Sequence, residues 1–164
     1  MKKHKLAFFF ILFLYILASI VMNSTVRKSE IFNEAINKGI SLTHNQVTVL
    51  AVVSSIFTVL LLSIFLILAR LLLILMSKIV FKKEDKKLIN EIYFVSVGSK
   101  LIFSTIAIVT LFSTTSWNFI LTSSCAIILY VIYFFTNKQN NISERPKKEI
   151  MFQVITGCLL ILFI

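Results

Sequence analysis

Long apolar runs separated by short polar stretches make up this chain. The runs are continuously apolar and do not show the alternation of apolar and polar residues that is typical of a membrane β-barrel strand. Lipid offers the backbone no hydrogen-bonding partner, so only helices and closed barrels can cross it. The pattern therefore predicts an all-α fold, a polytopic transmembrane helical bundle.

We expect a single membrane domain over residues 1–164 with about five spans. The expected spans are residues 6–22, 47–69, 97–112, 117–135 and 150–164. The apolar run from Val47 to Phe81 would measure about 52 Å as one helix, against a hydrocarbon core of roughly 30 Å. We therefore end the second span before Arg70 and expect residues 71–96 to form a cytoplasmic interfacial segment.

Residues 101–135 contain no charged side chain and could form one overlong helix or two spans. The consecutive hydroxyl residues from Ser113 to Ser116 suit a turn, and Trp117 is a typical anchor at a membrane interface. We therefore expect a hairpin of two spans. Either the bilayer thins around the short third span, with Lys100 near its cytoplasmic end, or that span starts nearer Ile92 and Lys100 lies deeper.

Three shorter segments are less strongly patterned. The N-terminal run is either an uncleaved first helix, which we favour because no good small-x-small site follows it, or a signal peptide. The last run, residues 150–164, is either a short fifth span or a segment that lies in the interface. Between the first two runs, Phe32 and Ile36 recur at helical spacing and predict a short surface helix that ends near Gly39.

Basic residues cluster at the ends of the apolar runs and predict the orientation. The chain has 17 basic and 7 acidic residues, and its formal net charge is +10. The N-terminal tail, residues 78–87 and residues 138–148 hold most of the positive charge. Cytoplasmic loops are enriched in Lys and Arg, so we expect the N-terminus in the cytoplasm. The basic ends of the apolar runs are suited to a bilayer with anionic headgroups. Binding of nucleic acid would need a folded basic domain, which the sequence does not contain.

Composition fits the same picture. Hydrophobic residues make up 58% of the chain, above the roughly 45–50% that is usual in soluble domains. Lys outnumbers Arg, and Ile, Asn and Phe are abundant, which suggests an AT-rich genome. We expect a multi-pass protein of the cell membrane, in the plasma membrane of a Gram-positive bacterium.

Arg70 and Lys100 are the most informative single residues, because a charge within an apolar run is costly and marks a candidate functional site. Each either snorkels to the headgroups or helps to bind an anionic headgroup or a partner's carboxylate. We expect both cations at similar depth on the cytoplasmic side, with Glu91 as the nearest candidate counter-ion. The candidate contact residues for a partner or a lipid headgroup are Arg70, Lys100, Glu91, Lys82, Lys83, Lys86 and Lys87.

No motif in the sequence points to catalysis. There is no HExxH, no GxSxG and no P-loop pattern. His4 and His44 stand alone in polar segments, without further ligands at metal-binding spacing. Cys125 and Cys158 fall within apolar runs, where thiols are usually inert. We therefore expect no enzymatic activity, no cofactor and no metal.

The order of segments in the second part of the chain carries a resemblance. A basic, Phe-containing stretch, Phe81-Lys82-Lys83-Glu84, is followed by an interfacial run from Leu88 to Ser99, then by a hairpin of spans and a last short span. This layout over residues 47–164 resembles bacterial Yip-type membrane proteins, the Ypt-interacting-protein domain family with five spans. The family's usual proline at the entrance of the third span is replaced here by Lys100-Leu101.

The resemblance implies a non-enzymatic accessory role, since some bacterial members of the family are encoded with ABC exporters that deal with antimicrobial peptides. We therefore expect an integral membrane accessory protein that binds a membrane partner, such as the subunits of an exporter of that type. One alternative is an immunity protein against a bacteriocin or a membrane-active toxin. Another is a small-solute transporter subunit, which the sparse ionisable residues in the spans favour less. A neighbouring ATPase and permease would favour the first role, and a neighbouring toxin gene the second.

The charge pattern predicts a topology that single cysteines can test. In a variant without Cys125 and Cys158, Ser41→Cys should react with an impermeant thiol reagent in intact cells. Glu84→Cys should react only after the membrane is permeabilised, because it lies in the basic cytoplasmic segment. The reverse labelling pattern would overturn the orientation.

Overall fold

A computed structural model gives the fold of this chain. It describes residues 2–82, 85–110, 116–138 and 147–164. Every regular element in this part of the chain is an α-helix. The helices are α1 (Lys2–Asn37), α2 (His44–Phe81), α3 (Lys86–Val109), α4 (Ser116–Lys138) and α5 (Lys147–Phe163). The expected all-α fold is confirmed.

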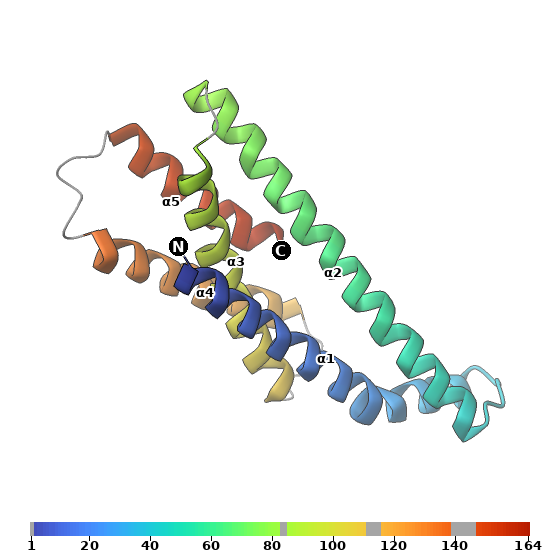
Figure 1. The fold of residues 1–164 in the computed structure, drawn as a ribbon. Helices are drawn as coiled ribbons and strands as arrows, with labels where there is room; N and C mark the ends of the chain where they lie inside the picture. Colours follow the sequence, from blue (N-terminus) through green and yellow to red (C-terminus); the bar gives the residue numbers. More distant parts are fainter. Residues whose placement is uncertain (1, 83–84, 111–115, 139–146) are drawn as a thin grey trace.

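Four of these helices, α1 to α4, are long and apolar enough to cross a membrane. The coarser part of the expectation, a bundle with several helices that could span a membrane, is therefore shown. The α5 helix has 17 residues, about 26 Å of rise, and ends beside the middle of α2 (Figure 1). A fifth span over residues 150–164 stays a prediction.

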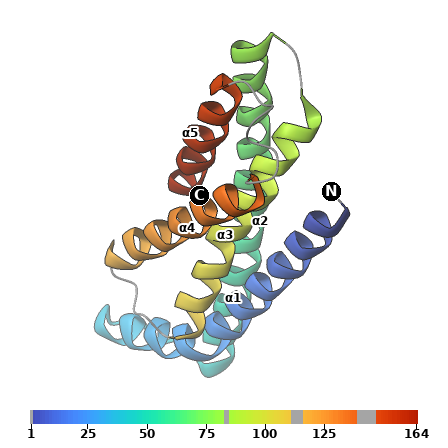
Figure 2. The same ribbon diagram turned by 90° about the vertical axis from the view of Figure 1, so that its left-hand side faces the viewer.

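The α3 helix lies at the centre and contacts all four other helices (Figures 1 and 2). Its side chains Ile92, Val97 and Leu101 are at most 1% exposed. They form one core with residues of α1, α2 and α5, in which Phe8 packs against the rings of Tyr93 and Phe94. The middle of α3 is buried on every side, since the six consecutive residues from Ser96 to Leu101 are all buried, unlike a surface helix with one apolar face.

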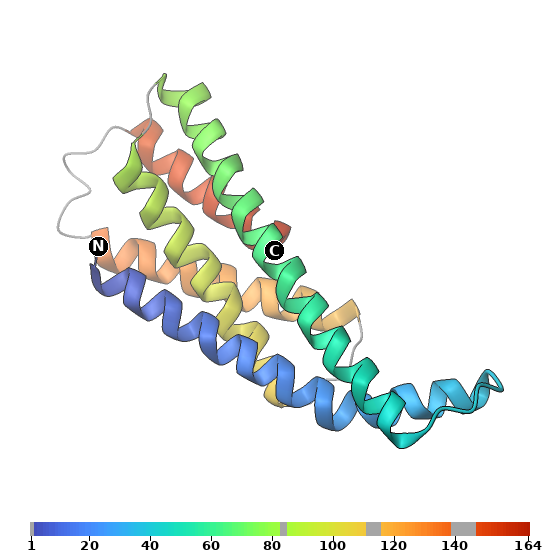
Figure 3. The same ribbon diagram turned by 45° about the vertical axis from the view of Figure 1, so that its right-hand side comes forward.

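One end of the bundle gathers the basic segments. The start of α1, the end of α2, the start of α3, the end of α4 and the start of α5 all lie at that end (Figure 3). Lys5, Lys78, Lys86 and Lys148 belong to these helix ends. The positions that the charge pattern assigns to one face of the membrane therefore lie together, and we call this region the basic end.

The α2 helix continues without a break past Ala69, where we expect the second span to end, as far as Phe81. Lys82 then ends it with a left-handed backbone, φ 56°, and its N–H donates to the carbonyl of Lys78. Asp85 starts α3 by accepting hydrogen bonds from the backbone N–H groups of Lys87 and Leu88. Residues 71–81 are therefore the end of α2, and residues 86–96 are the start of α3.

Two further helix ends follow the sequence signals closely. The predicted short surface helix is the last part of α1, which ends at Asn37, two residues before Gly39 with its φ of 72°. The N–H groups of Gly39 and Ile40 donate to the carbonyls of Ile36 and Ala35, the two bonds of a Schellman motif. The predicted turn after α3 is bracketed by Val109 and Ser116, although residues 113–115 lie outside the described residues.

The contact between α4 and α5 depends on Gly157. The Tyr130 hydroxyl donates to the backbone carbonyl of Gln153 at 2.8 Å. This places the phenol ring directly against Gly157, where an added Cβ would overlap the ring. The absence of a side chain at residue 157 therefore allows the two helices to approach closely.

Gly157→Ala should lower the free energy of unfolding by about 1–3 kcal/mol through overpacking. Gly98→Ala is the matched control, because the nearest atom to its added Cβ is in Phe8 at 3.9 Å, an ordinary contact. Gly98→Ala should leave stability unchanged or slightly raised. The measurement is thermal unfolding in detergent, and equal effects of the two substitutions would contradict this packing.

Candidate functional site

Lys100 lies buried inside the bundle, in the interior of α3. It is about 20 Å along the helix axis from Lys86, and the residue is 3% exposed. Its Nζ donates to the Ser123 hydroxyl at 2.5 Å and to the Thr122 hydroxyl at 3.3 Å. The ammonium also lies 4.2 Å from the centroid of the Phe119 ring. All of these contacts come from α4.

Small residues of α3 make room for the close approach of its neighbours. Ser96 and Ser99 are buried, and their hydroxyls donate to the carbonyls of Ile92 and Val95 in their own helix. Their polar groups are therefore satisfied without a partner on another helix. Together with Gly98, they give α3 the small-residue surface that favours tight packing in membranes.

The environment of Lys100 differs from that of a snorkelling residue. An ammonium in an apolar interior is costly unless it is hydrogen-bonded, and two hydroxyls and an aromatic face supply that compensation. Phe119 and Thr122 belong to the first turns of α4, which lie at the end of the bundle away from the basic end. The side chain therefore reaches into α4 rather than towards the basic end.

Arg70 is exposed on α2, nearer the basic end. Its Nη2 donates to the Asn90 side-chain oxygen of α3 at 3.5 Å. One turn along α2, the carbonyl of Leu66 accepts a hydrogen bond from the Tyr93 hydroxyl at 3.1 Å. These two polar contacts join α2 to α3, and they leave the Arg70 side chain accessible from outside the bundle.

Arg70 and Lys100 do not form one site. Asn90, the partner of Arg70, and Lys100 are about 15 Å apart along α3, and Lys100 contacts α4 rather than α2. The expected similar depth of the two cations is therefore not what the structure shows. Glu91 is about 13 Å along α3 from Lys100, so it does not act as the local counter-ion of that ammonium.

Glu91 belongs instead to a polar cluster between α3, α4 and α5. It lines a small cavity together with Tyr130, Tyr133 and Gln153. Gln153 is 1% exposed, and its side-chain oxygen has no hydrogen-bond partner among the described residues. Sequence reasoning missed this cluster, although a lone Gln inside the last apolar run is a signal that could have pointed to it.

The basic end carries the remaining candidates. Lys82, Lys86 and Lys87 are exposed, whereas Lys83 lies outside the described residues. Lys148 of α5 is a further contact that the sequence did not single out. Its Nζ donates to the Val80 carbonyl at 3.1 Å and lies 5.9 Å from the Phe81 ring centroid. This contact joins the start of α5 to the end of α2.

The exposed candidate residues are mainly cations, which suit the binding of anionic groups. Exposed ammonium groups at the basic end and the exposed guanidinium of Arg70 can bind phosphate or carboxylate oxygens. Within the described ranges, no group of three His, Cys, Asp or Glu residues is placed to hold a metal ion. The two cysteines are free thiols.

Comparisons with protein-family models, with curated proteins and with solved structures find no match for this chain.

A double-mutant cycle tests the Lys100 contact. Ser123→Ala should lower the free energy of unfolding by about 1–3 kcal/mol, because it removes a partner of a buried cation. In a Lys100→Met background the same substitution should have almost no effect, because the charge is absent. Stability is measured by unfolding in mixed detergent.

Ser63→Ala is the control for loss of a helix hydroxyl, since Ser63 is exposed and bonds only to the Val59 carbonyl. It should change stability by less than about 0.5 kcal/mol. Equal effects of Ser123→Ala in both backgrounds would show that Lys100 and Ser123 are not coupled.

Proposed function

We propose that this chain is a non-enzymatic membrane accessory protein that binds another membrane protein along the outer side of α2. One observation carries the proposal: α2 presents an apolar stripe that the rest of the chain leaves uncovered. The residues of this α2 stripe, each more than half exposed, are Val49, Val53, Ile56, Leu60, Ile64, Ile67, Leu71, Leu75 and Ile79.

The α2 stripe is longer than the hydrocarbon core of a bilayer is thick. From Val49 to Ile79 it measures about 45 Å along the helix, whereas the hydrocarbon core is roughly 30 Å. Even at a tilt of about 40°, the upper end of the usual range, it would project over about 35 Å. A partner helix would shield the excess apolar surface from water and headgroups.

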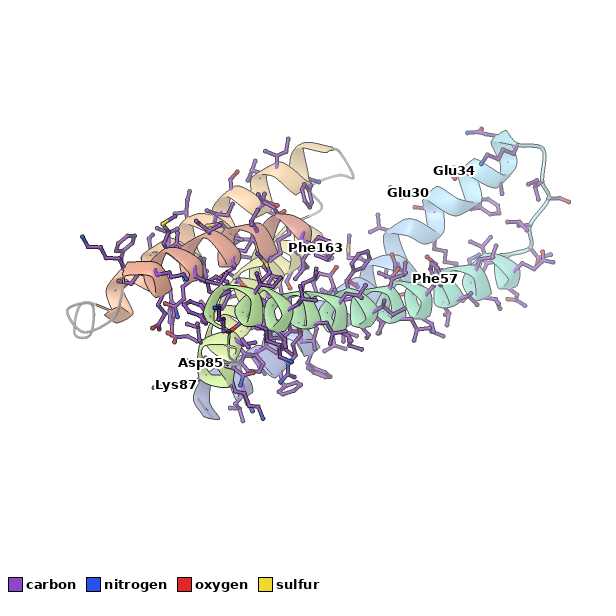
Figure 4. The ribbon with its side chains drawn as sticks, turned by 90° about the horizontal axis from the view of Figure 1, so that it is seen from above. Glu30, Glu34, Phe57, Asp85, Lys87 and Phe163 are labelled. Carbon is purple, nitrogen blue, oxygen red and sulfur yellow. The ribbon has the colours of Figure 1, made fainter. Side chains whose placement is uncertain are left out.

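The α2 helix also has few neighbours over half of its length. The α5 helix contacts α2 through the ring pairs Phe81–Phe152 and Phe65–Phe163. From Phe65 back towards its start, α2 extends past the end of α5. Figure 4 shows Phe57 on this part of α2. The α1 helix lies beside this part of α2 (Figure 3). This half of α2 has room for another helix.

Arg70 gives such an interface a specific polar contact. Its exposed guanidinium lies at the edge of the α2 stripe and makes one long hydrogen bond, to Asn90. A carboxylate from a partner helix would form a stronger, charge-assisted pair with it. Lys82, Lys86 and Lys87 would meanwhile bind anionic lipid headgroups at the basic end.

We also propose how the chain lies in the membrane. The basic end, with the N-terminus, faces the cytoplasm of a Gram-positive bacterium, and α5 is a short fifth span. The chain has a Yip-type layout and serves exporter subunits linked to antimicrobial-peptide defence. The same face of α2 would serve an immunity protein that captures a helical toxin, so the identity of the bound protein separates the two roles.

Photo-crosslinking in native cells tests the α2 interface. A photoreactive amino acid at Ile67 should form an adduct with a membrane protein. The same group at Ile128 of α4 should not, although Ile128 is similarly exposed, at 58% against 62%. An exporter subunit in the adduct supports the accessory role, and a small peptide supports immunity. Equal absence of protein adducts at both positions would contradict the proposal.

Arg70 variants test the polar contact. Arg70→Glu should reduce the adduct several-fold, because it would repel a partner's carboxylate, while Arg70→Lys should retain most of it. Normal membrane levels of each variant are the control for folding. Undiminished crosslinking of Arg70→Glu would exclude Arg70 from the interface.

A further inference from the structure

The last part of α1, residues 26–37, turns away from the axes of α2 and α3 (Figures 3 and 4). We call it the α1 tail. Hydroxyl side chains at its start bond back to the helix: Thr25 donates to the Val21 carbonyl at 2.7 Å, and Ser29 to the Val26 carbonyl at 2.7 Å. Such bonds compete with the helix ladder and often bend helices.

The bend lies at the level where the bundle ends. The α1 and α3 helices run in the same direction (Figure 3) and are in register where Phe8 packs on Phe94. From Phe8 to Thr25, α1 rises about 25 Å, and from Phe94 to Val109, α3 rises about 22 Å. The α1 tail therefore leaves the bundle where α3 stops, at the end opposite the basic end.

The α1 tail is amphipathic. Phe32 and Ile36 lie one turn apart on one face and are 39% and 56% exposed, and Ile40 follows at 51%. Glu30 and Glu34 lie on the opposite face and are exposed (Figure 4). A helix with one apolar and one charged face suits the boundary between lipid and water.

The apolar face of the tail continues the face that α1 exposes within the bundle. Phe10, Leu14 and Val21 are exposed, and helical periodicity places them on the same side as Phe32 and Ile36. This continuity favours lipid over a separate protein partner as the neighbour of the tail.

We infer that the α1 tail lies on the surface of the lipid bilayer, at the end of the bundle away from the basic end, with Phe32 and Ile36 among the lipid headgroups. The contact of Lys28 Nζ with His44 Nε2, at 3.0 Å, holds the base of the tail against the start of α2. This contact fixes the position of the start of the tail relative to α2. This inference does not depend on the proposed partner.

Site-specific fluorescence in nanodiscs tests the inference. The purified protein, with Cys125 and Cys158 replaced by serine, carries one cysteine at Phe32, Ile36, Glu30 or Glu34, labelled with a polarity-sensitive dye. The discs contain phosphatidylcholine and phosphatidylglycerol, with or without lipids that carry a nitroxide near the headgroup. Circular dichroism and elution volume confirm that each variant is folded.

Dyes at residues 32 and 36 should show blue-shifted emission and several-fold stronger quenching by the nitroxide lipids than dyes at residues 30 and 34. Equal, weak quenching at all four positions would show that the tail stands in water and would overturn the inference. Blue-shifted emission at residues 32 and 36 without nitroxide quenching would also overturn it, since it would mean that protein covers the face.

Discussion

The burial of the Lys100 ammonium is the constraint on which the packing of the central helices depends. A cation in an apolar bundle must find partners within the protein, and here α4 supplies them through Ser123, Thr122 and Phe119. This contact sets the register of α3 against α4. With α3 fixed in this way, Tyr130 and Glu91 come to line the same cavity, and Tyr130 is placed to bond to α5.

The two ends of the molecule serve different purposes in this account. At the basic end, Lys148 and Phe152 join α5 to the end of α2, and exposed lysines are available to headgroups. At the other end, α1 and α2 extend past the shorter helices and expose apolar faces. The outer side of α2 and the α1 tail are two of the apolar surfaces that the described residues leave exposed. The first is proposed for a protein partner and the second for lipid.

Hydropathy was sufficient to predict the all-helical membrane bundle, because long apolar runs have no other stable structure in lipid. Local signals also predicted the helix end at Gly39 and the gap between α3 and α4. The sequence did not show that residues 86–96 are packed inside the bundle as the first part of α3, because they mix polar and apolar side chains and resemble an interfacial segment. Their polar residues in fact pack between helices, as Ser96 does, or pair across them, as Asn90 does.

The candidate site was harder to predict, because its polar residues find their partners on other helices. The sequence identified Arg70 and Lys100 as unusual, since any charge in an apolar run stands out. It did not reveal that their partners are Asn90 on one side and Ser123 on the other, because hydroxyl and amide residues are common in spans and most bond only to their own helix. Gln153 and Lys148 gain their roles from helices distant in sequence, which no local pattern encodes.

Hydroxyls of α4 hold the Lys100 ammonium inside the bundle. Solid-state NMR of the protein in bilayers, with ¹⁵N-labelled lysine and ¹³C-labelled serine, measures this contact directly. We expect a dipolar coupling between Lys100 Nζ and Ser123 Cβ that disappears in Lys100→Met. The absence of that coupling in the unsubstituted protein, with the ammonium signal accessible to water, would contradict it.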